Sequence, residues 1–488
     1  MASQKRPDER PKELTIDDLR GALARHRQEH VLDHWDRLDE SGRERLFAQL
    51  ARITPQLSDL ISAYEAALPS AAASKTGPAR IEPAPAIALP ENGGDPEAAE
   101  SARKRGEEIL GDGRLGVFLV AGGQGTRLGF PHPKGCYPVG PISDRSLFEI
   151  QAQKIRGLAR RTGRIVPWYI MTSDATDAET RAAFEANDYY GLDPADVQIF
   201  QQDMVPAFDF EGRLILERPD RLFENPNGHG GSLTALETSG ALDDMEARGV
   251  DTLFYYQVDN PLVKIGDPTY LGFHDLSGSE LSCKVIRKAD PMEPVGVIAR
   301  VDGHVGVVEY TELRDEERFA RGEDGRLRFW AGSIAVHVIH TDFARRVAAD
   351  AYRLLPFHLS AKKIPFVDAS GNQQTPDEPN GYKLERFVFD ALREAREVCV
   401  VETTATEEFS PIKNAEGPDS PETCRRALTA QYRRWLEDAG LEVPGDTTAM
   451  EIDHSVIDGP RDVTTAGFER LADAGSAVRI TRRTETDQ

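Results

Sequence analysis

The chain has 488 residues, enough for two or three domains, and 39% of them are hydrophobic, as in ordinary globular proteins. Its 59 basic and 82 acidic side chains give a formal net charge of −23, which disfavours nucleic acid or an anionic membrane as the main partner, because both require a large basic face. The four cysteines form no CxxC pair, the N-terminus lacks the apolar core of a signal peptide, and no apolar run reaches the roughly 18 residues of a membrane span, so we expect a cytoplasmic protein.

Helix is predicted first, from Thr15 to about Ser62, because apolar residues recur there at every third or fourth position and Thr15 is a suitable N-cap. A stretch rich in proline and alanine, Pro69–Pro96, follows and is typical of an extended connector. We therefore predict an N-terminal helical element with its connector over residues 1–105.

Strand-like and helical runs alternate through residues 106–395, the order typical of an α/β sheet with parallel strands and helical crossovers. In chain order we predict a strand at Leu115–Ala121, a helix at Leu147–Ala159, a strand at Ile165–Met171, a helix at Ala178–Glu185, and strands at Val197–Phe200 and Thr252–Val258. Two strands, Val295–Arg300 and Val305–Tyr310, follow each other closely and predict a mixed or antiparallel extension of the sheet. A strand after Glu397 and a helix at Pro421–Ala439 begin a small C-terminal domain, predicted over residues 396–488.

The first of these strands runs into a glycine loop, within LGVFLVAGGQGTRLGFPHPK at Leu115–Lys134. Glycines let backbone N–H groups approach an anion, and Arg127 and Lys134 add full positive charge, so the loop predicts a nucleotide-phosphate site. Its spacing fits neither the dinucleotide fingerprint nor a P-loop. Because Pro131 and Pro133 prevent a helix from starting at once, we expect Lys134 on an extended segment that folds back over the phosphates. A plain glycine turn is the structural alternative.

The loop sequence GGQGTRLGFPHPK resembles the signature of the UDP-sugar pyrophosphorylases, most closely that of their UDP-N-acetylhexosamine branch. Further segments similar to that family are FQQDMVP from Phe200, NPNGHGGSLTAL from Asn225, YYQVDNPLVKIGDP from Tyr255, PNGYKLERFVFDAL from Pro379 and EFSPIKNAEGPDSPET from Glu408. The resemblance covers nearly the whole chain. It implies a Rossmann-like, GT-A-like nucleotidyltransferase core with a mixed sheet, an N-terminal helical element and a small C-terminal domain.

The same resemblance implies a uridylyltransferase that makes UDP-N-acetylglucosamine and pyrophosphate from UTP and N-acetylglucosamine 1-phosphate, assisted by Mg²⁺ or Mn²⁺. A phosphate oxygen of the sugar attacks the α-phosphorus of UTP in line, so catalysis depends on alignment and charge neutralisation and not on an enzyme nucleophile. The implied catalytic residues are Arg127, Lys134 and Lys413. The implied UTP-binding residues are Val120, Ala121, Gly122, Gly123, Gly125, Thr126, Lys134, Gln202, Gly228, Asp259 and Lys383. The implied sugar-phosphate residues are His229, Glu309, Tyr310, Ser333 and Lys413.

Asp259 is the candidate metal ligand. It follows the apolar run Thr252–Val258 and is therefore expected at the carboxyl end of a strand, where open α/β sheets bind ligands. Magnesium takes several of its ligands from substrate phosphates and water, so one protein carboxylate can suffice. An Asp-Asn pair that caps a turn before Pro261 is the structural alternative.

Two positions depart from the N-acetylhexosamine pattern. His229 and Ser333 stand where that branch has asparagine, and a serine hydroxyl is shorter than an amide that could bind an acetamido group. The alternatives are therefore a uridylyltransferase for glucose, galactose or N-acetylgalactosamine 1-phosphate, and a non-catalytic sensor that binds UDP-sugars. The sequence leaves open whether Lys383 or Lys413 contacts the reacting phosphate, and it leaves open the oligomeric state, with a monomer favoured.

Overall fold

The structure is a computed structural model that describes residues 14–72, 80–463, 467–470 and 477–481. The chain forms two compact units. The first comprises Met1–Ser74, Asp203–Gly230 and Tyr352–Phe387, and the second comprises Lys75–Gln202, Gly231–Ala351 and Val388–Gln488. The N-terminal helices thus share a unit with two segments from within residues 106–395. The division of the sequence at residues 105 and 395 stays a prediction.

Three helices and several short strands build the first unit. They are α1 Ile16–Arg25, α2 Glu40–Ile53, α3 Leu57–Ala72, β5 Met204–Pro206, β6 Phe208–Asp209, β7 Leu216–Arg218, β8 Arg221–Leu222, β9 Glu224–Pro226, β15 His358–Lys362, β16 Phe366–Val367, β17 Gln373–Gln374 and β18 Gly381–Glu385. The predicted N-cap is confirmed, because the Thr15 side chain accepts from the Asp18 N–H. The prediction that the connector begins at Pro69 is wrong, because α3 continues to Ala72. Pro69, which has no N–H group, lies in the last turn of this helix.

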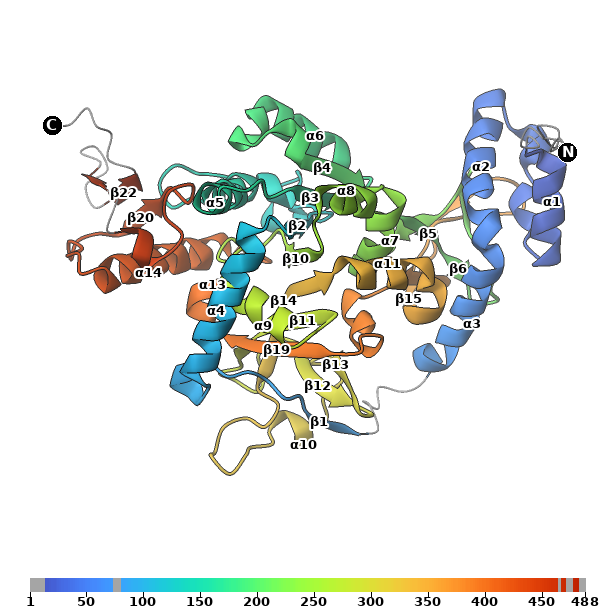
Figure 1. Cartoon of the computed structure of the whole chain (residues 1–488). Helices are drawn as coiled ribbons and strands as arrows, with labels where there is room; N and C mark the ends of the chain where they lie inside the picture. The colour runs from blue at the N-terminus through green and yellow to red at the C-terminus, as the bar shows by residue number, and fades with distance from the viewer. Residues whose placement is uncertain (1–13, 73–79, 464–466, 471–476, 482–488) are drawn as a thin grey trace, which may run out of the picture. The chain divides into compact units, whose positions relative to one another are not determined.

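A ten-stranded mixed sheet forms the centre of the second unit (Figure 1). Its strands are β1 Ile81–Pro83, β2 Leu115–Val120, β3 Trp168–Thr172, β4 Val197–Gln201, β10 Thr252–Gln257, β11 Leu281–Arg287, β12 Val297–Val301, β13 His304–Val308, β14 Ala331–His340 and β19 Val398–Thr403. The helices of this unit are α4 Pro96–Gly111, α5 Leu147–Thr162, α6 Asp177–Ala186, α7 Ser232–Thr238, α8 Ala241–Arg248, α9 Pro268–Leu276, α10 Asp315–Arg318, α11 Thr341–Ala349, α13 Ala405–Glu408, α14 Pro421–Asp438 and α15 Pro460–Val463. A short helix, α12 Ala351–Leu354, begins at the last residue of a second-unit segment, and the strands β20 Ala449–Ile452, β21 Gly467–Arg470 and β22 Ala477–Thr481 form a separate small sheet.

Parallel and antiparallel pairings occur where the sequence predicts them. β2, β3, β4 and β10 pair in parallel, and β12 and β13 form the expected antiparallel pair. The antiparallel strand β14 joins β10 to β11 and β12. The fold is therefore the predicted mixed α/β core.

The carboxyl ends of the four parallel strands coincide. Gln257 of β10 lies opposite Val120 of β2, which lies opposite Met171 of β3 on its other side. Thr172 of β3 in turn lies opposite Gln201 of β4. The segments that follow these strands therefore leave the sheet at one edge, which is where ligands bind in folds of this class.

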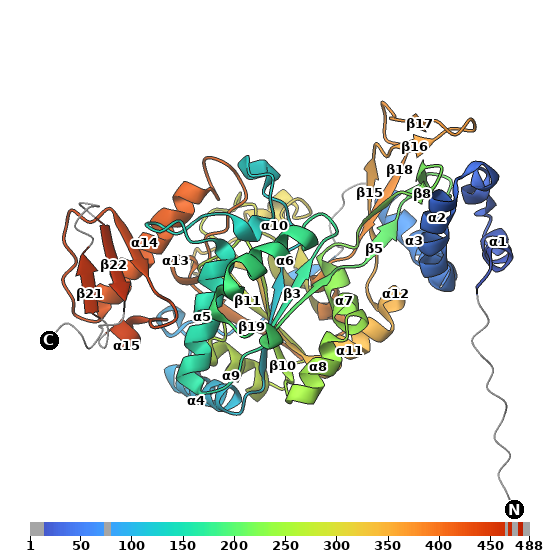
Figure 2. The ribbon, with the colours of Figure 1, turned by 90° about the horizontal axis from the view of Figure 1, so that it is seen from above.

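Helices cover both faces of this sheet. On one face, Leu119 of β2 shares an apolar cluster with Ile109 of α4 and Ile155 of α5. On the other face, the Tyr169 hydroxyl of β3 donates to Asp244 of α8 at 2.7 Å. Figure 2 shows α4, α5 and α9 on one side of the strands and α7, α8 and α11 on the other. Burial on both faces explains why these strands are continuous apolar runs in the sequence.

Helices α4 and α9 approach each other at two glycines. A Cβ atom on Gly272 of α9 would lie 1.7 Å from the Ala102 carbonyl oxygen, and one on Gly106 of α4 would lie 1.8 Å from the Pro268 carbonyl oxygen. No side chain larger than hydrogen fits at either position. The two helix backbones are therefore in direct contact.

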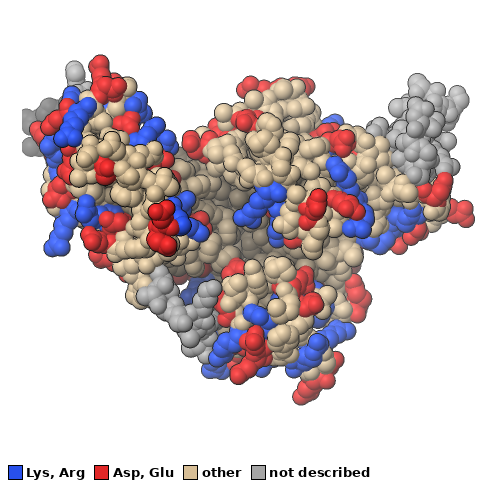
Figure 3. Space-filling model, turned by 180° about the vertical axis from the view of Figure 1, so that it is seen from behind, with Lys and Arg blue, Asp and Glu red and all other residues tan. Residues whose placement is uncertain are grey.

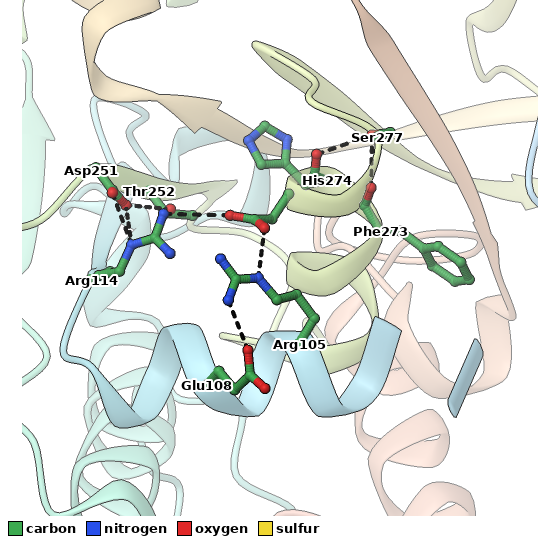
Figure 4. Close-up of polar contacts among 9 residues, drawn as sticks. Arg105, Glu108, Arg114, Asp251, Thr252, Phe273, His274 and Ser277 are labelled. Carbon is green, nitrogen blue, oxygen red and sulfur yellow. Dashed lines mark hydrogen bonds and ion pairs between the residues drawn. The ribbon is translucent and has the colours of Figure 1, made fainter. Parts of the chain in front are cut away.

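Ion pairs lie beside this contact (Figure 4). Arg105 Nε of α4 donates to Asp275 Oδ2 of α9 at 2.7 Å, and Arg114 Nε donates to both carboxylate oxygens of Asp251 at 3.1 and 2.8 Å. Arg114 and Asp251 immediately precede β2 and β10. These bonds fix the amino ends of the two strands that lead to the glycine loop and to Asp259.

Charges of both signs mix on the visible surface. In Figure 3, basic and acidic side chains are interspersed on the face shown, without a surface of one sign. Among the described residues, no helix has the length and apolar character to cross a membrane.

Candidate functional site

The glycine loop follows β2 and folds back on itself. The Lys134 N–H donates to the Gly123 carbonyl oxygen at 3.0 Å, and the Gly125 N–H donates to the His132 carbonyl oxygen at 2.9 Å. The predicted fold-back is confirmed for the chain itself, and its place over the phosphates stays a prediction.

Lys134 itself lies in a different conformation from the extended one predicted. It begins a 3-10 turn, Lys134–Cys136, that is closed by the Cys136 N–H on the Pro133 carbonyl oxygen. The turn is possible because Gly135 packs directly on a ring of α5, where a Cβ atom would lie 2.1 Å from Phe148 Cζ. Lys134 is thereby held close to the core.

The loop presents backbone donors and a cation at the edge of the sheet. Val120 ends β2, the Ala121 N–H still bonds to β3, and Thr126 begins a short 3-10 turn. Within the described part of the chain, no acceptor is found for the N–H groups of Gly122 and Gly123, nor any partner for the exposed Arg127 guanidinium. Such a set of N–H groups beside cations can bind an anion.

Gln202 lies against this loop, and its predicted pairing with uracil stays a prediction. A Cβ atom on Gly122 would be 2.8 Å from Gln202 Nε2, so the absence of a side chain on Gly122 lets the amide approach the loop backbone. The Gln202 N–H continues the pairing of β4 with β3, donating to the Thr172 carbonyl oxygen at 2.9 Å. The amide therefore lies at the same edge as the phosphate loop.

Lys134 and Asp259 meet at the carboxyl ends of β2 and β10. Lys134 Nζ is 3.4 Å from Asp259 Oδ2, and the two side chains are only 18% and 14% exposed. Asp259 follows β10 by two residues, so its predicted place at a strand end is confirmed. A carboxylate and an ammonium side by side can bind a metal cation and phosphate oxygens, respectively.

Lys413 lies close in the chain to a backbone bond with the turn that carries Asp259. The Ile412 N–H donates to the Asp259 carbonyl oxygen at 2.9 Å. The Lys413 side chain is 43% exposed, and its Nζ lies 3.8 Å from Asp419 Oδ2. Its ammonium is therefore only loosely held and can turn toward a ligand.

The predicted sugar residues of the second unit form a group of their own. Glu309 immediately follows β13, and its Oε1 would lie 3.3 Å from a Cβ atom on Gly296. The Ser333 N–H of β14 donates to the Gly296 carbonyl oxygen at 2.8 Å, so Glu309 and Ser333 lie on either side of this glycine. Tyr310 is 40% exposed, with its carbonyl oxygen bonded to Arg318.

Three predicted residues, Gly228, His229 and Lys383, belong to the first unit. Gly228 has φ +71°, and a Cβ atom there would be 2.5 Å from the Arg386 carbonyl oxygen, so this glycine is required by local packing. The His229 ring stacks on Phe387 at 5.2 Å, and Lys383 Nζ lies 4.9 Å from the centre of the Phe223 ring. Their roles in ligand binding stay predictions.

Two residues that support the site in the second unit, Ser173 and Asn260, were not predicted from the sequence. Ser173 Oγ donates to the Gly122 carbonyl oxygen at 2.8 Å and fixes one peptide of the loop. Asn260 bonds to the backbone of the segment that leads to Lys413. The structural role of Asn260 was indicated by the sequence VDN, because one interpretation of it was an Asp-Asn pair that caps a turn.

Known proteins resemble this chain over most of its length. Residues 81–440 match the family described as UTP–glucose-1-phosphate uridylyltransferase. A human UDP-N-acetylhexosamine pyrophosphorylase-like protein 1 is 41% identical over 441 residues, 87% of this chain and 86% of the relative. The UDP-N-acetylglucosamine pyrophosphorylase of Saccharomyces cerevisiae is 36% identical over 431 residues, 85% and 90% of the two chains. A crystal structure of the UDP-N-acetylglucosamine pyrophosphorylase of Trypanosoma brucei, in complex with an inhibitor, superposes with a TM-score of 0.79 at 26% identity and covers 96% of this chain and 98% of that one.

Proposed function

Because the chain belongs to the UTP–glucose-1-phosphate uridylyltransferase family, we propose that it makes UDP-N-acetylglucosamine and pyrophosphate from UTP and N-acetylglucosamine 1-phosphate. The relatives at 41% and 36% identity, which carry N-acetylhexosamine and N-acetylglucosamine in their names, support this sugar. The structural observation that carries the proposal is the edge at which the glycine loop, Lys134 and Asp259 meet.

In the proposed reaction, a phosphate oxygen of the sugar 1-phosphate forms a bond to the α-phosphorus of UTP. The bond from the α-phosphorus to the oxygen that bridges to the β-phosphate breaks, and its electron pair leaves with pyrophosphate. The N–H groups of Gly122 and Gly123 bind the triphosphate, while Arg127 and Lys134 neutralise charge that accumulates on the leaving group. Lys413 aligns the attacking phosphate.

The donor set at Asp259 fits Mg²⁺ or Mn²⁺ shared with the substrate. Among the described residues no group of three or more His, Cys, Asp or Glu side chains could hold a metal ion. Asp259 Oδ2 faces Lys134, and within the same described residues Oδ1 has no partner. One carboxylate oxygen together with phosphate oxygens and water is a usual magnesium environment. A bound divalent cation would supply neutralisation of the phosphate charge.

Base and sugar recognition are assigned to the remaining residues. The Gln202 amide can pair with a carbonyl and an N–H of uracil, with Gly228 and Lys383 as further UTP contacts. Glu309 accepts hydrogen bonds from sugar hydroxyls, with Tyr310 and Ser333 as further sugar contacts. His229 is a separate assignment, which rests on the family resemblance alone. Because Ser333 is shorter than an asparagine, a transferase for glucose, galactose or N-acetylgalactosamine 1-phosphate is the second candidate.

Pyrophosphate release tests the proposal. The full chain is incubated with UTP, Mg²⁺ and each of four sugar 1-phosphates, and initial rates are compared. We expect the highest kcat/KM with N-acetylglucosamine 1-phosphate. A higher value with another sugar would establish the second candidate, and UDP-sugar binding without turnover on any substrate would identify a non-catalytic sensor instead.

A further inference from the structure

A buried asparagine joins the turn that carries Asp259 to the loop that carries Lys413. Asn260 is 5% exposed, and its Nδ2 donates to the Glu408 carbonyl oxygen at 2.7 Å. Its Oδ1 accepts from the Ser410 N–H at 3.1 Å. One side-chain amide thus bonds to both an acceptor and a donor of the same backbone segment. A carboxylate cannot do so, because it only accepts.

A backbone bond reinforces this link. The Ile412 N–H donates to the Asp259 carbonyl oxygen at 2.9 Å. The Asp259 turn, Val258–Lys264, and the Lys413 loop, Glu408–Lys413, are therefore joined immediately beside both functional side chains.

The Lys413 loop starts from a fixed point. The Glu408 side chain is buried, and its Oε1 accepts from Thr403 Oγ1 at 2.8 Å and from Lys284 Nζ. Lys284, 2% exposed, also donates to Asp267 Oδ2 at 2.7 Å. A buried ammonium with two carboxylate partners is strongly restrained, because the loss of its bond to Glu408 would leave that buried carboxylate without a cation beside it.

The Asp259 turn is fixed from its opposite side by α5. The fully buried Gln151 donates to the Val258 carbonyl oxygen at 3.1 Å, and Lys154 Nζ donates to the carbonyl oxygens of Pro261 and Val263. The Asp259 turn and the Glu408 end of the Lys413 loop are thus both held by buried side chains, and the Asn260 amide links them.

We propose that Asn260 is a positioning residue, which sets the spacing between the two backbone segments that carry the carboxylate of Asp259 and the ammonium of Lys413. The inference rests on the proposed function, in which these groups act on the two phosphates that react. Because misplacement by about 1 Å can cost on the order of 100-fold in rate, a side chain that contacts no substrate can control turnover in this way.

The test compares Asn260→Ala with a matched control, Gln431→Ala. Gln431 is 2% exposed, and its Nε2 donates to the Glu407 carbonyl oxygen at 2.6 Å, so it holds the same helix α13 by the same kind of bond; among the described residues it makes no hydrogen bond to the Asp259 turn. Melting temperature, kcat and the KM for UTP are measured for both variants. We expect similar losses of melting temperature, but a fall in kcat of about 10- to 100-fold for Asn260→Ala alone, with little change in KM. A folded Asn260→Ala enzyme with the kcat of Gln431→Ala would overturn the inference.

A double-mutant cycle with Lys413→Ala separates positioning from general destabilisation. If Asn260 acts through Lys413, the combined loss of kcat is smaller than the product of the single losses, whereas independent effects multiply. Asn260→Asp gives a second cycle should Asn260→Ala fail to fold, because it keeps the acceptor for Ser410, loses the donor to Glu408 and adds a negative charge beside Asp259. If the kcat losses of the single variants multiply in the double variant, and the wild-type chain is active, the inference is overturned but the proposed function is not. Failure of the wild-type chain to release pyrophosphate would overturn the proposed function as well.

Discussion

The substitution Gly123→Ala separates binding of a nucleotide from stability of the loop. Within 4 Å of a Cβ atom built on Gly123 there is no described atom outside its chain neighbours, and the residue does not have a left-handed φ. The methyl group therefore disturbs no contact within the protein, and we expect the free energy of unfolding to change by about 0.5 kcal/mol or less.

The effect on UTP is expected to be much larger. The proposed phosphate contact uses the N–H of Gly123, and a methyl group on the same residue prevents the phosphate from approaching it closely. A hydrogen bond to a charged group contributes about 1.5–3 kcal/mol, and 1.4 kcal/mol corresponds to a factor of ten. The KM for UTP should therefore rise about 10- to 100-fold, as measured by pyrophosphate release and checked by calorimetric titration of the nucleotide.

Gly125→Ala provides the contrast. A Cβ atom there would lie 2.7 Å from the Phe130 carbonyl oxygen and 2.9 Å from its Cδ1, so the loop itself must open, at a cost of about 1–3 kcal/mol. This variant should lose stability and UTP affinity together. A Gly123→Ala protein with unchanged KM and unchanged affinity for UTP would refute the assignment of the loop to the triphosphate.

Three further outcomes are expected. Lys134→Met should lower kcat by about 100- to 1,000-fold at saturating substrate with a small change in melting temperature, and wild-type turnover in the folded variant would exclude Lys134 from catalysis. Gly272→Ala should lower the free energy of unfolding by about 3 kcal/mol, because its Cβ atom meets the α4 backbone, and an unchanged urea midpoint would contradict that contact. Burial lowers the pKa of His274 and of His337 from 6.5 to about 4, so both stay neutral in the folded chain while the unfolded chain takes up protons below pH 6.5. Stability should therefore fall by about 2 kcal/mol per histidine between pH 6.5 and 5, and a His337→Gln variant with the wild-type pH slope in urea unfolding would refute this cause.

The parts of the site that follow from the local sequence were predictable. The apolar run before the glycine loop predicts a buried strand, the prolines predict the fold-back, and the run before Asp259 places this carboxylate at a strand end. The distance of 3.4 Å between Lys134 and Asp259 depends on the register of β10 against β2, for which no local pattern exists. The 3-10 turn at Lys134 depends likewise on the packing of Gly135 against α5.

The pairing of strands that lie far apart in the sequence could not be predicted. The strand β19 stands in the region predicted as a C-terminal domain, yet it pairs in parallel with β11 in the large sheet. Its apolar run fits either position, because a strand pattern shows burial and not the identity of the neighbour. The strands between residues 203 and 230 are two or three residues long, too short for any period to show.

The discontinuity of the first unit affects how the protein can be made. Leu19 of α1 and Leu46 of α2 share an apolar cluster with Phe208 and with Leu384, which is translated far later. Until β18 emerges, the nascent chain carries an uncovered apolar surface that invites chaperone binding or aggregation. A recombinant version shortened at its amino end would suffer the reverse defect, because the later strands would lack their helical cover.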